Sequence, residues 1–365
     1  MLERVLEAHR LLVVRLDNIG DVIMLGPALR ALRKTCPKAD ISLLCSPAGS
    51  TIAGLLPEVD ELIVERTLWQ DAGGVLPFDP DREQRLVTRL KMGRFDAAFV
   101  FTSFSQSPWP PAYACYLAGI PVRVGQPKDF GGSLLSHRVE PPPDHVHQVD
   151  RNLSLLRGVG VRDDGIHMSL SLTSEARAGA LSILERIGVK PPEPFVLLAP
   201  AASCQARSYA PSRFKEVARI VRERSGLPVL VVGSERDAAT QGPLRELAQE
   251  HGGAHWLVGS TTVPELCAII SRASVVVTNN SGPLHMADAF CRPQVVLYSG
   301  TDLVSHWEPR RSRHSLLRVP TPCTPCYRFS CPLDRHECLD LSPEFVAEEV
   351  LSLLPQKCAV TKASQ

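Results

Sequence analysis

The stretch LLVVRLDNIGDVIMLGPALRALRKTC, residues 11–36, decides the fold of this chain. Residues 11–16 are a run of aliphatic residues interrupted by one arginine, which is typical of a buried strand. From Asp21 onward apolar residues recur with helical spacing, which predicts a helix with one apolar face that Pro37 ends. A strand that leads directly into a helix is the start of a βαβ unit, and Asp21 stands where the two meet.

The same alternation of strands and helices continues along the chain. Further strands are predicted at residues 41–45, 62–65, 97–101 and 121–124, and a helix at residues 146–157. The pattern begins again near residue 173, and residues 195–199 are predicted to be the first strand of a second domain. We therefore predict an α/β chain of two doubly wound, Rossmann-like domains that face each other across a ligand cleft.

Composition and charge exclude several other classes of protein. The chain has 365 residues, of which 44% are hydrophobic and 22% charged, and its 40 basic and 39 acidic residues give a net charge of +1. This balance argues against disorder and against a nucleic-acid partner. No apolar run is long enough to cross a membrane, and the charged N-terminus MLERVLEAHR does not resemble a signal peptide. We expect a cytoplasmic protein.

Familiar catalytic and nucleotide motifs are missing from the sequence. There is no G-x-G-x-x-G after residue 16 or 232, no G-x-x-x-x-G-K-[ST] and no G-x-S-x-G. These gaps disfavour a nicotinamide-dependent oxidoreductase, a P-loop NTPase and an α/β-hydrolase. The D-x-D at residues 79–81 has no strand before it, and we interpret it as a turn.

Four segments occupy predicted strand-to-helix junctions, where backbone N–H groups and the helix dipole favour anions. They are RLDNIGD at 15–21, APAASCQARSYAP at 199–211, VVGSERD at 231–237 and TNNSGPLH at 278–285. Asp21 is either a helix cap, a role that Asp17 can fill in another register, or a general base. Arg207 is either a phosphate-binding cation or a solvated loop arginine. His285 is either a ligand of the site or a core histidine.

In this order and separation, the segments resemble the heptosyltransferases of glycosyltransferase family 9. The resemblance covers roughly residues 12–354. Its most specific pieces are IGD at 19–21, TNNSGPLHMADA at 278–289 and SGTD at 299–302, and HQVDRN at 147–152 and WEP at 307–309 also match. Members of this family transfer heptose from ADP-heptose to the inner core of lipopolysaccharide.

The resemblance implies a GT-B fold and a role for each segment. Residues 1–172 would form an acceptor-binding domain, residues 173–341 a nucleotide-sugar-binding domain, and residues 342–365 a helix that crosses back to the first domain, followed by a tail. Transfer would invert the anomeric centre and need no metal or other cofactor, with Asp21 as general base. The implied nucleotide-sugar-binding residues are Ser203, Arg207, Gly233, Asn280, Ser281, Gly282 and His285.

The chain departs from the family at three positions. Asn280 replaces a usual Asp, Tyr209 stands where a Trp is common, and Glu308 replaces a common Gly. The first departure bears on donor preference. A transferase for another nucleotide sugar and a catalytically weakened nucleotide-sugar-binding module therefore remain alternatives.

Eleven cysteines, an odd number, suit a reducing compartment. Five lie in apolar segments and are expected to be small buried hydrophobes: Cys36, Cys45, Cys115, Cys267 and Cys291. Four others crowd into a proline-rich segment: Cys323, Cys326, Cys331 and Cys338. These four are either a structural zinc site, in which His336 can replace one ligand, or a loop of partly buried free thiols.

The expected partners are an ADP-heptose donor and a lipid-linked saccharide acceptor. A basic run at residues 310–318, with Arg30, Arg33 and Lys34, offers either a solvated face or a peripheral contact with anionic lipid on the inner membrane.

Overall fold

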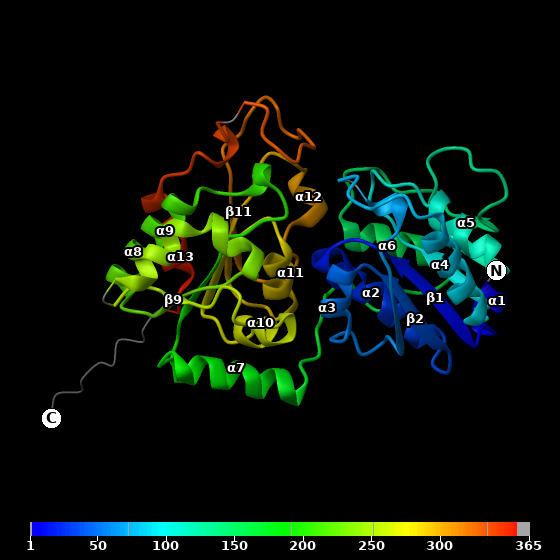
Figure 1. Ribbon diagram of the computed structural model, residues 1–365, viewed down its shortest axis with the longest axis horizontal. Helices are drawn as coiled ribbons and strands as arrows, with labels where there is room; N and C mark the ends of the chain where they lie inside the picture. The colour runs from blue at the N-terminus through cyan, green and yellow to red at the C-terminus, as the bar shows by residue number, and fades with distance from the viewer. Residues whose placement is uncertain (1, 72, 191, 251, 334, 356–365) are drawn as a thin grey trace. The chain divides into compact units, whose positions relative to one another are not determined.

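A computed structural model describes residues 2–71, 73–190, 192–250, 252–333 and 335–355, which fold into two compact units (Figure 1). Unit 1 runs to residue 173 and also includes Leu303–Arg310, and unit 2 consists of Ser174–Asp302 and the residues from 311 onward. The boundary between the units thus lies between residues 173 and 174, whereas the predicted domain boundary lies between residues 172 and 173. Each unit is described by itself below.

Unit 1 is built on a sheet of six parallel strands in the order β3-β2-β1-β4-β5-β6. The strands are β1 Arg10–Arg15, β2 Asp40–Cys45, β3 Glu61–Val64, β4 Ala97–Val100, β5 Val122–Gly125 and β6 His137–Arg138. This order is the doubly wound one, and it reverses direction between β1 and β4. Ligands of such sheets bind beyond the carboxyl ends of the two strands where the order reverses.

Helices lie against this sheet in two groups (Figure 1). In one group α2 contacts α3 and α6, and in the other α4 contacts α5. The helices of unit 1 are α1 Leu2–Leu6, α2 Ile19–Thr35, α3 Pro47–Ala53, the 3₁₀ turn η1 Leu68–Gln70, α4 Pro80–Met92, α5 Trp109–Leu117, α6 Gln148–Arg157 and α12 Val304–Trp307. Leu12 and Val14 of β1 are buried with Leu86 and Leu90 of α4, so the apolar run that begins the chain forms the core.

Unit 2 repeats the same plan with six parallel strands in the order β12-β11-β10-β7-β8-β9. They are β7 Val196–Ala199, β8 Val229–Val231, β9 His255–Trp256, β10 Val275–Asn279, β11 Gln294–Leu297 and β12 His314–Leu317. Here the order reverses between β7 and β10. The prediction of two doubly wound α/β domains is confirmed.

The helices of unit 2 are α7 Ser174–Arg186, η2 Gln205–Arg207, α8 Pro211–Ser225, η3 Glu235–Thr240, α9 Gly242–Gln249, α10 Val263–Ile270, α11 Gly282–Ala289, η4 Glu337–Leu339 and α13 Pro343–Leu353. Helix α13 lies in unit 2 and packs against α8, whereas we expected it to cross back to the first domain. Its apolar residues Val346 and Val350 are buried with Phe214 and Val217 of α8, and this shared core holds it there. The segment that joins unit 1 instead is Leu303–Arg310.

Two local predictions were wrong. The D-x-D at 79–81 is a helix start, because the side chain of Asp79 accepts the backbone N–H of Arg82 at the N-terminus of α4. Cys291 is exposed, since it follows α11 with a φ of 53° and so leaves the buried face of the helix. Cys36, Cys45, Cys115 and Cys267 are buried as expected.

Among the described residues, no helix combines the length and the apolar character needed to span a bilayer.

Candidate functional site

Asp21 lies in the first turn of α2, directly after β1, and is held by an arginine from the strand itself. Arg15 Nη2 lies 2.7 Å from Asp21 Oδ1, and the Arg15 side chain is fully buried. The same nitrogen donates to Ser103 Oγ, 3.0 Å away in the loop after β4. The carboxylate is therefore fixed at the place where the strand order of unit 1 reverses.

A second carboxylate, Asp17, shares the same arginine. Arg15 Nε lies 2.9 Å from Asp17 Oδ2, and Gln70 Nε2 donates to Asp17 Oδ1 at 3.0 Å. Gln106 Nε2 donates to the same Asp17 oxygen. Burial raises the pKa of Asp17, with the nearby Asp21 adding to the rise and Arg15 opposing it. One guanidinium thus serves two carboxylates.

Neither aspartate is the N-cap of α2, since that position belongs to Asn18. Asp21 occupies the third helical position, and its Oδ2 accepts the Asn18 N–H at 3.3 Å. Gly20 lies between them in the first turn of α2. Asp21 therefore has a capping contact through one oxygen and the arginine contact through the other.

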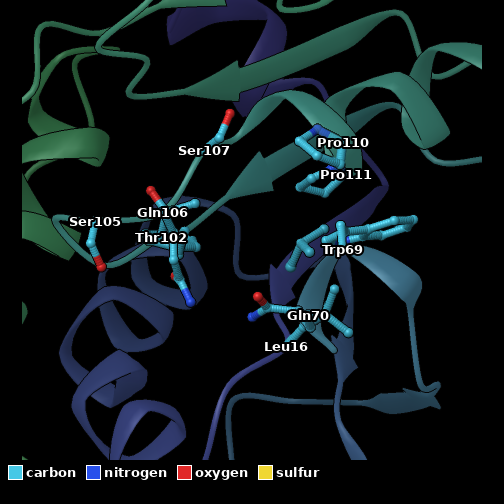
Figure 2. Close-up of a pocket in the computed structure, with 11 residues that line it drawn as sticks. Leu16, Trp69, Gln70, Thr102, Ser105, Gln106, Ser107, Pro110 and Pro111 are labelled. Carbon is cyan, nitrogen blue, oxygen red and sulfur yellow. The ribbon is translucent and has the colours of Figure 1, made fainter. Parts of the chain in front are cut away.

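A pocket of about 220 Å³ opens beside this cluster in unit 1. Figure 2 shows Trp69 and Gln70 on one side of it and Thr102 and Gln106 on the other. Its remaining lining residues are Val14, Leu16, Phe101, Ser105, Ser107, Pro110 and Pro111. The two glutamines that hold Asp17 thus also line the pocket, which combines amides and hydroxyls with apolar and aromatic side chains.

Arg207 occupies the corresponding place in unit 2, after β7. Its Nη2 lies 2.7 Å from Asp302 Oδ2, and its Nε donates to Thr301 Oγ1 at 3.2 Å. Nη1 lies 3.5 Å from Ser203 Oγ. The guanidinium is about a quarter exposed, so it is oriented from one side and open on the other. The structure thereby joins two segments that the sequence offered separately, the loop at 199–211 and SGTD at 299–302.

The loop that carries Arg207 is tied to the end of β10 by Asn279. Its Nδ2 donates to the Pro200 carbonyl at 2.6 Å, and its Oδ1 accepts the Tyr209 N–H at 3.1 Å. Tyr209 itself is buried, and its hydroxyl donates to the Leu341 carbonyl at 2.8 Å. Tyr209 thus anchors the loop from within the core.

The N-terminus of α11 lies at the end of β10, next in the sheet to β7. Ser281 is its N-cap residue, although its hydroxyl contacts Thr278 Oγ1 at 3.2 Å and caps no backbone group. Asn280 and His285 are both buried, and their Nδ2 and Nδ1 atoms have no hydrogen-bond partner within the described chain. Buried polar atoms are normally paired, so these two mark a place where a ligand can bind.

His285 is neutral under ordinary conditions. Burial lowers its pKa to about 4, and the nearby Arg207 acts in the same direction while Asp288 opposes it. The Asp288 carboxylate accepts the backbone N–H groups of Arg311 and Ser312 at 2.9 and 2.7 Å, so it stabilises the fold. The site at α11 therefore presents Arg207 as a cation and His285 as a neutral polar group.

Gly233 lies after β8 at the same edge of the sheet, where its carbonyl accepts the Gly259 N–H at 3.0 Å. The next residue, Ser234, is the N-cap of η3, and the carboxylate of Asp237 accepts its N–H at 2.7 Å. No contact of Gly233 with the Arg207 cluster appears among the described residues, so its nucleotide-binding role stays a prediction.

The segment Leu303–Arg310 brings the WEP motif against the HQVDRN motif within unit 1. His147 Nε2 lies 3.1 Å from the Glu308 carbonyl oxygen, and Arg310 Nη1 lies 2.9 Å from Asp150 Oδ2. The Phe104 ring stacks on His306 with centroids 4.4 Å apart. These motifs therefore hold this segment in place.

The cysteine-rich segment contains free thiols. Burial raises the pKa of Cys338, and the neighbouring Cys323, Cys331 and Cys326 add to the rise. Over the described ranges, no group of three or more His, Cys, Asp or Glu side chains is arranged to hold a metal ion. Both interpretations of the four cysteines, the zinc site and the loop of thiols, stay predictions.

Comparison with known proteins places these motifs in a family. The family model "Glycosyltransferase family 9 (heptosyltransferase)" matches residues 84–336. Lipopolysaccharide heptosyltransferase 2 of Escherichia coli K12 is 24% identical over 95% of this chain and 99% of its own length.

Solved structures share the fold at low identity. A glycosyl transferase family 9 structure from Veillonella parvula superposes with a TM-score of 0.78 at 19% identity, covering 95% of this chain and 97% of the other. The E. coli ADP-heptose lps heptosyltransferase II gives a TM-score of 0.72 at 22% identity, over 94% and 98% of the two chains.

Proposed function

Because this chain belongs to glycosyltransferase family 9, the heptosyltransferases, we propose that it moves heptose from ADP-heptose to an inner-core saccharide of lipopolysaccharide or a related surface glycan. The fold is GT-B, and the enzyme is a glycosyltransferase. One observation carries the finer proposal: Asp21 and Arg207 stand at the reversal points of two equivalent sheets, each fixed by an oppositely charged partner.

Asp21 is the general base in this proposal. It takes the proton from an acceptor hydroxyl while that oxygen forms a bond to the anomeric carbon of the donor. The bond from the anomeric carbon to the diphosphate oxygen breaks, and its electron pair leaves with ADP. Attack from the face opposite the leaving group inverts the anomeric centre. Arg15 supports the role, because it leaves the carboxylate one orientation.

Arg207 and the N-terminus of α11 bind the donor diphosphate in this proposal. Negative charge develops on ADP as the bond breaks, and a planar guanidinium and exposed backbone N–H groups stabilise that charge. Ser203, Ser281 and Gly282 lie at the same two loops. The unpaired Asn280 Nδ2 supports a ligand at this place. A fixed cation and helix dipole suffice for this task, so we propose catalysis without a metal.

The pocket beside Asp17 binds part of the saccharide acceptor. Trp69 offers an apolar face for a sugar ring, and Gln70 and Gln106 offer amides to its hydroxyl groups. The acceptor is lipid-linked, so we propose that the enzyme works in the cytoplasm at the surface of the inner membrane. Many of the basic residues suggested for contact with the membrane already form ion pairs within the protein, such as Arg33 with Asp60 and Lys34 with Asp164. Binding of the protein to lipid vesicles tests this contact.

A second candidate is a transferase for another nucleotide sugar. Asn280 favours this second candidate, because it replaces the family's usual Asp and an amide can hydrogen-bond a hydroxyl of the donor sugar without carrying a charge. The weakened binding module predicts donor binding without turnover, and the Asp21→Asn comparison in the Discussion separates it from an enzyme.

The test is calorimetric titration of ADP, UDP and GDP into the purified protein, with and without EDTA, followed by a transfer assay. We expect selective ADP binding that EDTA does not change, and turnover of ADP-heptose with inverted product stereochemistry by NMR. Preference for UDP or GDP would favour the second candidate. Loss of turnover in EDTA would contradict the metal-free mechanism, and elemental analysis of the same sample tests for zinc.

A further inference from the structure

The cysteine loop, here residues 320–333, lies against the SGTD turn that contacts Arg207. Within this loop the Cys326 N–H donates to the Gly300 carbonyl at 3.0 Å, and the Tyr327 N–H donates to the Thr301 carbonyl at 2.9 Å. Two successive backbone bonds therefore hold the loop along the turn. Although this loop is distant in sequence from the junction at 199–211, the fold brings the two together.

The same loop also contacts the turn that carries Arg207 itself. The Ala206 N–H donates to the Phe329 carbonyl at 3.0 Å, and the Cys331 N–H donates to Gln205 Oε1 at 3.1 Å. Gln205 and Ala206 immediately precede Arg207 in η2. One loop is thus bonded on one side to the arginine's own turn and on the other to the turn that orients its guanidinium.

Gly300 of the SGTD turn packs closely against the cysteine loop. A Cβ atom placed there would lie 2.3 Å from Thr324 Oγ1 and 3.3 Å from Cys338 Cβ. Real Cβ atoms do not approach other atoms as closely as 2.3 Å, so a larger residue must either turn the Thr324 hydroxyl away from Thr321 or push the loop and the turn apart. The constraint at Gly300 is one of space and not of backbone conformation, since its φ lies outside the left-handed region.

We propose that the cysteine loop is a positioning element for the donor, which fixes the Arg207 guanidinium before the diphosphate binds. Arginine has many rotamers, and a site that selects one in advance spends less binding energy on ordering it. Thr301 and Asp302 make that selection, and the loop holds their turn and η2 in register. Loss of the loop contact then weakens donor binding while the chemistry at Asp21 is kept.

This inference rests on the proposed function, in which Arg207 binds the donor diphosphate. The experiment therefore measures ADP affinity by calorimetry on four full-length proteins: wild type, Arg207→Ala, Gly300→Ala, and Gly242→Ala as a matched control. The space around Gly242 is open, with no atom within 4 Å of an added Cβ, so the control should bind like wild type. If Arg207→Ala binds ADP like wild type, the proposed donor site is wrong. If Arg207→Ala loses binding and Gly300→Ala does not, the loop inference alone is overturned.

We expect Gly300→Ala to raise the Kd for ADP about tenfold, which corresponds to a loss of about 1.4 kcal/mol of binding free energy. The double variant Gly300→Ala/Thr324→Ala removes the clashing oxygen and should return the Kd to within about twofold of wild type. In the transfer assay Gly300→Ala should raise the donor KM and also lower kcat at saturating donor, because Arg207 both binds the diphosphate and stabilises the charge that develops on ADP as the bond breaks. A double variant as weak as the single one would overturn the proposal.

Gln205→Ala is the second variant, and it keeps the test valid if Gly300→Ala does not fold. Gln205 is exposed, so its truncation should leave the core intact while removing the acceptor of the Cys331 N–H. We expect weaker ADP binding, and a wild-type Kd for this variant contradicts the proposal.

Discussion

Arg15 Nη2 lies 2.7 Å from Asp21 Oδ1, and Arg15 is the last residue of β1, directly after the aliphatic run at residues 11–14. No part of its side chain is exposed. A buried charge is tolerated where it is paired, and Arg15 pairs with two carboxylates and donates to a serine through Nη2, while its Nη1 has no hydrogen-bond partner within the described chain. The candidate base is thus oriented by the core of unit 1.

Arg15→Met should both destabilise the protein and impair transfer. Removing one partner of a buried ion pair typically costs about 3–5 kcal/mol, because the remaining charges lose their compensation. We expect a lower free energy of unfolding in urea and a lower kcat at a temperature where the variant is folded. Arg10→Met is the matched control, since its ion pair with Glu61 is substantially exposed. An Arg15→Met enzyme with wild-type stability would contradict this account of the cluster.

Arg207→Lys should behave as a substantial loss although the charge is kept. The guanidinium contacts Asp302, Thr301 and Ser203 through three different nitrogens, and an ammonium cannot make this set of directed contacts. We expect the Kd for ADP to rise toward that of Arg207→Ala, as measured by calorimetry. Full ADP affinity in Arg207→Lys would mean that charge alone is recognised.

His285 should make stability depend on pH. Burial lowers its pKa to about 4 in the folded protein, whereas an unfolded histidine titrates near 6.5. Between these values the unfolded state binds the additional proton, so this contribution is present above about pH 6.5 and is lost as the pH falls toward 4. We expect the wild type to lose about 2 kcal/mol more stability between pH 7 and pH 5 than His285→Gln. Equal losses in urea titrations of both proteins would contradict the assignment.

Thiol labelling should divide the described cysteines by exposure. Cys291 and Cys323 are exposed, so iodoacetamide should modify them in the native protein. Burial raises the pKa of Cys45 to about 11 and of Cys115 and Cys267 to about 12, which disfavours the reactive thiolate. Peptide mapping by mass spectrometry checks this, with the unfolded protein as the control in which all thiols react. Native modification of Cys115 at the rate of Cys323 would contradict the buried assignment.

Much of the fold could be predicted because hydrophobic periodicity is a local signal. The strand at residues 11–16 and the helix after it appear within one residue or two of β1 and α2. Short edge strands such as β9, His255–Trp256, carry too few apolar residues to produce a pattern. The prediction that α13 crosses back to the first domain was wrong because amphipathic spacing indicates that a helix packs on one face but does not specify the element it packs against.

The site could be located from sequence more easily than its contacts could be. Glycine and proline mark the junction at α11, which indicates where a ligand can bind. The partnership of Arg207 with Asp302 joins residues 95 positions apart, and no local pattern reports such a contact. Arg15 is the sequence feature that indicates this carboxylate cluster, because a charged residue in a buried strand requires a charged partner nearby.

The most direct test of the account compares wild type with Asp21→Asn in both ADP binding and heptose transfer. Asparagine keeps the size of the side chain and removes its ability to accept a proton. Loss of a general base typically lowers the rate about 10²- to 10⁴-fold, so we predict a fall in kcat of this order with an unchanged Kd for ADP. Unchanged turnover in Asp21→Asn would contradict the assignment of Asp21 as the base, and with it the central claim.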